Sequence, residues 1–158
     1  MNKDKPFKHL WTIIAVLSFI ALLIVAYKIK DSLSPAITTT ATLNKSCDLR
    51  QGECLLKLPN GGQVSFSISP NHIPVLQPLE LKVTISDIKV SAIEVDFVGV
   101  DMDMGYNRSK LKKIDEQHFK GKVIIPVCAH SKMEWEARVL LQTDKGLSMA
   151  PFRFYTVK

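Results

Sequence analysis

Short runs in which apolar and polar residues alternate recur about every ten residues through most of this 158-residue chain. In the central run, Ile93, Val95 and Phe97 alternate with Glu94 and Asp96. A period of two is typical of a β-strand with one face buried. The same period is found in four other runs: 64–68, 79–86, 133–141 and 148–157. Clusters of glycine, proline and asparagine separate the runs, as they do between strands.

This pattern predicts an all-β domain in residues 47–158. The number and spacing of the runs favour an immunoglobulin-like β-sandwich of about seven or eight strands. No run in this part of the chain keeps a helical period long enough to predict a helix. We expect one N-terminal transmembrane helix before the sandwich.

The predicted transmembrane helix occupies residues 10–27, an apolar stretch that only Thr12 and Ser18 interrupt. Eighteen helical residues extend about 27 Å, close to the thickness of the hydrocarbon core of a bilayer. Trp11 and Tyr27 stand at its two ends, where aromatic rings favour the membrane interface. The run is longer than the roughly 7–15 apolar residues of a cleaved signal peptide. We therefore expect an uncleaved signal anchor that binds the lipid bilayer.

Residues 28–46 are predicted to link this anchor to the β domain. The segment is rich in serine, threonine and alanine and contains Pro35. An alternative is that its part Ile37–Leu43 pairs with the domain as a first edge strand. Residues 1–9 carry three lysines, whereas Lys28 and Lys30 follow the apolar stretch. This small excess of positive charge before the stretch favours a cytoplasmic N-terminus.

Cys47 and Cys54 are predicted to form a disulfide bond. They enclose six residues, whereas paired metal-binding cysteines usually have two to four residues between them. Disulfide bonds belong outside the cytosol. The domain is therefore expected to be extracytoplasmic, and periplasmic at the inner membrane if the source is a Gram-negative bacterium. Cys128 is left as an unpaired cysteine.

Charge and motifs exclude several classes of function. The net charge is +6, but residues 1–30 hold five lysines and one aspartate, which leaves +2 for residues 31–158. A nearly balanced domain carries no electrostatic footprint for nucleic acid. No phosphate-binding loop, dinucleotide fingerprint, zinc-protease helix or serine-hydrolase elbow is present. We therefore expect a protein that is not an enzyme.

The central strand changes parity where it ends. Beyond Gly99 the apolar residues stand on the other parity, and a glycine at such a change predicts a β-bulge. The bulge would present Met102 and Met104 as a pair, with Gly105 as a turn residue after them.

Five residues with soft or borderline donor atoms form the candidate metal site: Met102, Met104, Cys128, His130 and Met133. Thioether and thiolate sulfur are ligands for cuprous copper, and imidazole binds either copper state. Loops gather at the two ends of a sandwich, so two strand-end segments can meet there. The pattern predicts a copper site at one end of the domain. The alternative is that the methionines continue the apolar parity of their strands and pack in the core.

With these residues identified, the chain resembles the FixH / YtkA-like family of membrane-anchored bacterial proteins. The resemblance rests on the anchor, the Met102-x-Met104 strand end with its glycine turn, and the later Met133-x-Trp135 strand. It implies a role in copper supply or assembly for the cbb-type terminal oxidase, a copper-containing oxidase, or in related extracytoplasmic copper handling. The Cys47/Cys54 loop and Cys128 are not features assigned to that family. The alternative function is a structural or interaction module of an inner-membrane complex that holds no metal.

Overall fold

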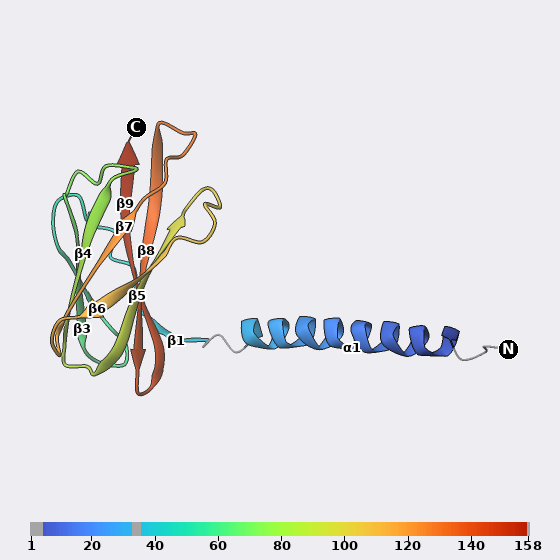
Figure 1. The fold of residues 1–158 in the computed structure, drawn as a ribbon. Helices are drawn as coiled ribbons and strands as arrows, with labels where there is room; N and C mark the ends of the chain where they lie inside the picture. The colour runs from blue at the N-terminus through green and yellow to red at the C-terminus, as the bar shows by residue number, and fades with distance from the viewer. Residues whose placement is uncertain (1–4, 33–35, 158) are drawn as a thin grey trace. The chain divides into compact units, whose positions relative to one another are not determined.

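The computed structural model describes residues 5–32 and 36–157, with side chains for residues 11–25 and 36–157. The chain divides into two compact units, Met1–Pro35 and Ala36–Lys158. Figure 1 shows one helix and a β domain built from nine strands. The elements are α1 (Lys5–Ser32), β1 (Ile37–Thr40), β2 (Cys54–Lys57), β3 (Gln63–Ser69), β4 (Pro78–Ser86), β5 (Val90–Gly99), β6 (Arg108–Lys113), β7 (His118–Ile124), β8 (Lys132–Thr143) and β9 (Gly146–Val157).

The first unit is the single helix α1. It contains the apolar stretch 10–27 and extends beyond it at both ends. The side chains of residues 11–25 are all exposed, including the large apolar ones such as Trp11 and Phe19. In the part of the chain that the structure describes, no helix meets the combined length and apolarity required to cross a membrane.

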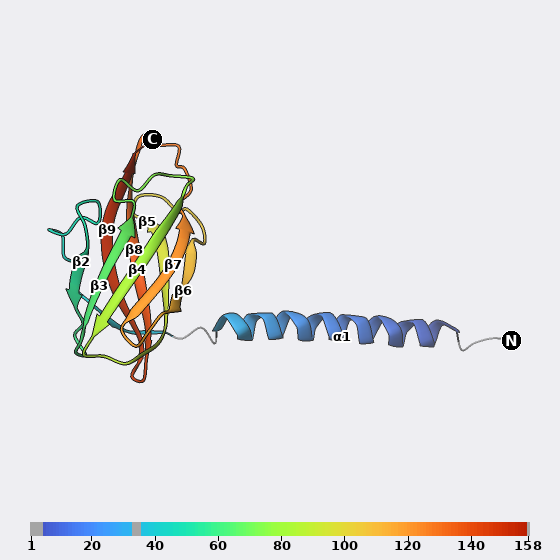
Figure 2. The ribbon, with the colours of Figure 1, turned by 60° about the vertical axis from the view of Figure 1, so that its left-hand side comes forward.

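The second unit is one continuous sheet in the order β1-β9-β8-β5-β6-β7-β4-β3-β2. Neighbouring strands are antiparallel except for β1, which runs parallel to β9. The strand β6 joins the two halves: Arg108–Leu111 pair with β5, and Lys112 and Lys113 pair with β7. In Figure 2, β2, β3, β4, β7 and β6 lie side by side in front of β9, β8 and β5.

The curled sheet encloses one hydrophobic core. The rings of Phe66 on β3 and Phe152 on β9 lie 5.4 Å apart, although these strands are not neighbours in the sheet. On the β5–β8–β9 half, Phe154 packs edge-on against Phe97 and stacks on Trp135. Aromatic pairs at these separations stabilise a core beyond the burial of their area. The alternation of buried and accessible residues along β3, β4, β5 and β8 confirms the prediction of an all-β domain.

One strand lies inside the segment predicted as a linker. β1 pairs with the first residues of β9, so the linker interpretation is wrong for these residues and the alternative edge strand is the one found. Ala41, directly after β1, is buried in the core. The strands β1 and β9 can approach closely here because Gly146 has no side chain: a Cβ there would overlap the hydroxyl of Thr38. With β1 and the other short strands, the sheet has nine strands, more than the seven or eight expected.

The predicted disulfide bond joins Cys47 to Cys54, with their Cα atoms 5.8 Å apart. The loop that it closes lies beside β9, where Asp48 forms an isolated parallel bridge to Arg153. Leu49 in this loop is fully buried in the core. The loop thus brings an apolar side chain into the core from outside the regular strands.

Candidate functional site

The candidate residues all lie at one end of the β domain, which we call the distal pole. It consists of the three connections 70–77, 100–107 and 125–131 together with the strand ends that they join. Strand register places these segments at the same end: Gly99 at the end of β5 faces Trp135, and Lys132 faces Val157 at the end of β9. The chain enters the domain at the opposite end, because β1 pairs with the beginning of β9. We call that end, with the turns 87–89, 114–117 and 144–145, the proximal pole.

The buried thiol of Cys128 is the centre of the candidate site. Cys128 is the free cysteine of the chain. Its Sγ lies 3.8 Å from Sδ of Met102, toward which it donates, and 3.7 Å from Nδ1 of His130. Met102 comes from the β5–β6 connection and His130 from the β7–β8 connection. Two segments that are far apart in the sequence therefore present sulfur and nitrogen donors to one thiol.

Gly99 connects this cluster to the other two methionines. A Cβ on Gly99 would overlap the backbone oxygen of Met102 and the terminal methyl group of Met133, and would press against Met104. The predicted bulge at Gly99 is not found: β5 ends there, and the irregularity in its pairing with β8 lies between Val90 and Ala92. The glycine is required for close packing and not for a bulge.

Hydrogen bonds hold the methionine-bearing connection in place. The backbone N–H of Val100 donates to the carbonyl oxygen of Glu134 at 3.1 Å, and that of Phe97 donates to Asn107 at 2.9 Å. The side-chain amide of Asn107 donates to the carbonyl oxygen of Met104 at 2.7 Å. The start and the end of the connection are thus both tied to the sheet, which fixes the position of Met102 between them.

The strand β8 supplies a rigid base for the site. Trp135 is fully buried, and its indole N–H donates to the hydroxyl of Thr156 on β9 at 3.1 Å. Met133, two residues earlier on the same face, is also buried. Met104 is half-buried and packs against the core. Both methionines are thus part of the core or packed against it, whereas Met102 is 37% exposed.

The predicted residues therefore fall into two groups that meet at the backbone of Met102. Cys128 contacts both Met102 and His130, while the side chains of Met104 and Met133 and the backbone oxygen of Met102 lie around Gly99. His118 lies away from this site, at the proximal pole beside Asp115. A cavity of about 10 Å³, the size of one water molecule, adjoins the thiol. Its lining residues are Val75, Val127, Cys128, His130, Ser131, Thr156 and Val157.

The lining residues other than Cys128 and His130 carry no sequence signal of a site, because isolated valines, a serine and a threonine are common at strand ends. Only the topology brings Val75 and Val157 to the thiol.

The separations of the Cys128 sulfur from the other two donor atoms fit a shared metal ion. Bonds of about 2.3 Å to sulfur and about 2.0 Å to imidazole nitrogen place two donors of one ion roughly 3.5–4.0 Å apart. The separations from the Cys128 sulfur, 3.8 Å and 3.7 Å, fall in this range. Thiolate, thioether and imidazole together match the preference of cuprous copper. Among the described residues, no three or more His, Cys, Asp or Glu side chains gather in a way that could hold a metal ion.

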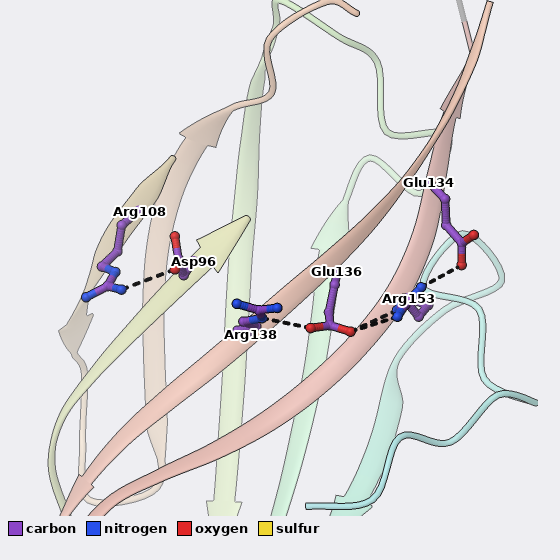
Figure 3. Close-up of polar contacts among 6 residues, drawn as sticks. All are labelled: Asp96, Arg108, Glu134, Glu136, Arg138 and Arg153. Atoms are coloured by element: carbon purple, nitrogen blue, oxygen red, sulfur yellow. Dashed lines mark hydrogen bonds and ion pairs between the residues drawn. The ribbon is translucent and has the colours of Figure 1, made fainter. Parts of the chain in front are cut away.

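A second polar cluster lies on the outer face of β5, β6, β8 and β9, and Figure 3 shows its ion pairs. Glu136 accepts hydrogen bonds from Arg138 at 2.7 Å and from Arg153 at 3.0 Å, and Arg153 also reaches Glu134 at 3.0 Å. Arg108 donates to Asp96 at 3.1 Å.

The pKa of Arg108 depends on the opposing effects of burial and of the acidic side chains around it. Burial lowers the pKa of the guanidinium, but the hydrogen bond and attraction to Asp96, with smaller effects of Tyr106 and Glu94, outweigh burial and leave the pKa raised. Every charge in the cluster has a partner of opposite sign on the same or a neighbouring strand. The charges of the cluster are therefore balanced across this face of the sheet.

The comparisons with known proteins assign no family to the chain. No protein-family model matches the chain, and no curated protein matches it. Among solved structures, the chain is similar to the crystal structure of a DUF4785 family protein from Legionella pneumophila subsp. pneumophila str. Philadelphia 1. The identity is 10% and the TM-score 0.43, over 61% of this chain and 28% of that one. At this level the likeness assigns neither a family nor a function. The class that the structure defines is a mainly β domain preceded by one helix.

Proposed function

We propose that the chain is a single-pass, membrane-anchored protein whose extracytoplasmic domain binds cuprous copper at the distal pole. In this proposal the domain is an immunoglobulin-like sandwich of the FixH / YtkA-like kind. It supplies copper to a copper-containing oxidase or assists the assembly of one.

The observation that carries the proposal is the convergence on Cys128. A thioether and an imidazole from separate connections stand at ligand spacing from one buried thiol. A thiolate ligand neutralises the charge of a cuprous ion, and the thioether of Met102 stays a ligand over a wide pH range because it does not titrate. Because one donor is partly exposed and one is buried, an ion can reach the site from solvent and then be held below the surface.

The membrane location is supported by the first unit and by the disulfide bond. Residues 10–27 are an apolar stretch of bilayer length, and the side chains described within it are exposed. The Cys47–Cys54 bond indicates an oxidising compartment for the domain. An N-terminus in the cytoplasm and a domain in the periplasm satisfy both observations.

A cuprous-chelator competition on the full chain in detergent tests the proposal. Met102→Leu preserves volume and should cost less than about 1.5 kcal/mol in folding. It should nevertheless weaken cuprous binding by more than the roughly 10–100-fold that is typical of losing an outer-shell partner. Cys128→Ser should weaken binding at least as much.

Met149→Leu is the matched control, because Met149 lies on β9 beside β1 at the proximal pole. It should bind cuprous ion as the parent does. If Met102→Leu and Cys128→Ser also bind as the parent does, the copper proposal is wrong.

One observation favours a second candidate, an interaction module without metal. Met133 is buried and Met104 packs against the core, as expected of residues that stabilise the fold alone. In that case the methionines belong to the core, and the edge of the sandwich recruits a partner in a membrane complex. The same competition separates the two candidates, since a module without metal gives no cuprous binding in the parent.

A further inference from the structure

The connection that carries Met102 also carries two carboxylates without cationic partners. Asp101 and Asp103 flank Met102, and both are exposed. Among the described residues, every acidic side chain on a strand forms an ion pair, as Glu80 does with Lys120. Asp101 and Asp103 form none. One oxygen of Asp103 accepts the backbone N–H of Gly105 at 2.9 Å, and the connection has no lysine or arginine between residues 99 and 107.

The surface around these carboxylates is apolar. Tyr106 is 80% exposed, and four smaller apolar residues are between 37% and 49% exposed: Val100, Met102, Val127 and Val157. Val127 and Val157 line the cavity beside the Cys128 thiol. The outer end of the donor cluster thus carries apolar side chains and the two carboxylates, with one exposed lysine, Lys132, at the start of β8.

Resting on the copper-binding function above, we propose that the distal pole is a docking surface for cuprous donors that carry positive charge. Asp101 and Asp103 attract the donor, and the apolar side chains around Met102 form the contact across which the ion passes. Opposite charge at an approach surface raises the rate of encounter. Carboxylate oxygen is a poor ligand for cuprous copper, so the two aspartates act on the approach of the donor and not as ligands.

The charge of the site before and after transfer shows whether the aspartates affect the rate of copper transfer or the affinity for copper. The bonds of the ion to its donor break, a copper–sulfur bond forms at Cys128, and the thiol proton leaves to solvent, with no change of oxidation state. A cuprous ion and a released proton carry the same charge, so the charge of the site is unchanged by binding. The aspartates therefore change the rate of transfer from a charged donor while the affinity at equilibrium stays the same.

Two small complexes test the proposal in the full chain in detergent. The cuprous neocuproine complex is cationic, and the cuprous complex of bathocuproine disulfonate is anionic. In Asp101→Asn/Asp103→Asn, transfer from the cationic complex should slow by about fourfold at low salt, which corresponds to one positive charge and two carboxylates about 10 Å away. Transfer from the anionic complex should accelerate. Salt at about 1 M, where the Debye length is about 3 Å, should remove both effects.

The matched control is Asp87→Asn/Asp144→Asn, which removes the same charge at the proximal pole, where Asp87 and Asp144 line one pocket. It should leave both rates unchanged. Equal rates for the distal variant and the parent would overturn the docking proposal while leaving copper binding intact. A fall in equilibrium affinity in the distal variant would also overturn it, because the aspartates would then hold the site or the ion itself. A parent that binds no cuprous ion removes the proposed function and this inference together.

Discussion

Gly99 lies where the three methionines of the candidate site come together. The backbone of Met102 and the side chains of Met104 and Met133 approach it so closely that any Cβ would overlap two of them. Its φ angle is not among the positive values of the chain, so backbone conformation alone does not require glycine. Space alone makes glycine necessary here.

Gly99→Ala should therefore disturb the site and the fold together. The added methyl group meets a backbone oxygen, which cannot move as a side chain can, so the cost should be about 1–3 kcal/mol. It should also displace Met102 from Cys128. Chemical denaturation of the variant measures the first effect, and cuprous competition measures the second.

Gly121→Ala is the matched control, since a Cβ there meets mainly the flexible side chain of Leu111, at 3.1 Å and beyond. It should cost less and leave cuprous binding unchanged. A Gly99→Ala variant as stable as Gly121→Ala would contradict the packing argument.

At the scale of residues, the metal-donor side chains could be predicted from the sequence, but the packing around Gly99 could not. Soft donors are recognisable as residue types, so Met102, Cys128 and His130 stand out without a structure. The parity change at Gly99 predicts a bulge because glycine and a shift of period accompany bulges. The structure requires glycine there because the backbone oxygen of Met102 and the side chain of Met133 both approach it closely. The second contact joins segments more than thirty residues apart, which local pattern does not reveal.

The disulfide loop is an element whose role depends on one buried side chain. Leu49 is fully buried, while the rest of the enclosed hexapeptide is polar or glycine. Burial of a leucine in a packed core stabilises a protein by several times the net contribution of one hydrogen bond. The bond between Cys47 and Cys54 keeps this leucine at the core by limiting the freedom of the loop.

Leu49→Ala should destabilise the domain by about 2–5 kcal/mol, because it leaves a cavity. Removing the bond through Cys47→Ala/Cys54→Ala should cost about 2–3 kcal/mol, the low part of the usual range, since the closed loop is short. Urea denaturation measures both. Leu55→Ala is the control: Leu55 is half-exposed on the neighbouring β2 and should cost much less. A Leu49→Ala variant no less stable than Leu55→Ala would exclude the core role of the loop.

The β6–β7 turn should show a defined response to acid. The Asp115 carboxylate accepts the backbone N–H groups of Gln117 and His118 at 2.9 Å and lies 2.8 Å from Nδ1 of His118. The bond from Gln117, then the bond with His118, lower the pKa of Asp115 below its ordinary value of 3.8. Because the pKa is lower in the folded state, the stabilisation is present above pH 3.8 and is lost as the pH falls through the folded value.

Asp115→Asn should remove that response. At pH 7 the parent should be the more stable protein, and the difference between the two should shrink as the pH falls below 3.8. Urea denaturation of both proteins at several pH values measures it. A difference that stays constant across this range would show that the carboxylate charge contributes nothing to the turn.

Alternation of apolar and polar residues is sufficient to predict most of the strands from the sequence, but it is insufficient at the edge of the sheet. The strands β3, β4, β5 and β8 bury one full face, so their period of two is visible in the sequence. β1 is three threonines after an isoleucine and buries no face, so its sequence equally fits a linker. Its pairing depends on the beginning of β9, which lies more than a hundred residues later.

The arrangement of the whole chain has a direct test in the cell. A reporter that is active only in the periplasm, fused after Lys158, should be active if residues 10–27 anchor the chain with its N-terminus inside. A reporter that is active only in the cytosol should be inactive at the same place. The reverse result would overturn the topology and, with it, the compartment in which the Cys47–Cys54 bond and the copper site are proposed to work.

The ligand shell of bound copper tests the central claim directly. X-ray absorption at the copper edge, on the full chain loaded with one equivalent of cuprous ion, should give two sulfur donors at about 2.3 Å and one nitrogen donor at about 2.0 Å. Met102→Leu should lose one sulfur, and Met149→Leu should keep both. A shell of nitrogen and oxygen alone, or a spectrum that Met102→Leu leaves unchanged, would contradict a copper site built on Cys128, Met102 and His130.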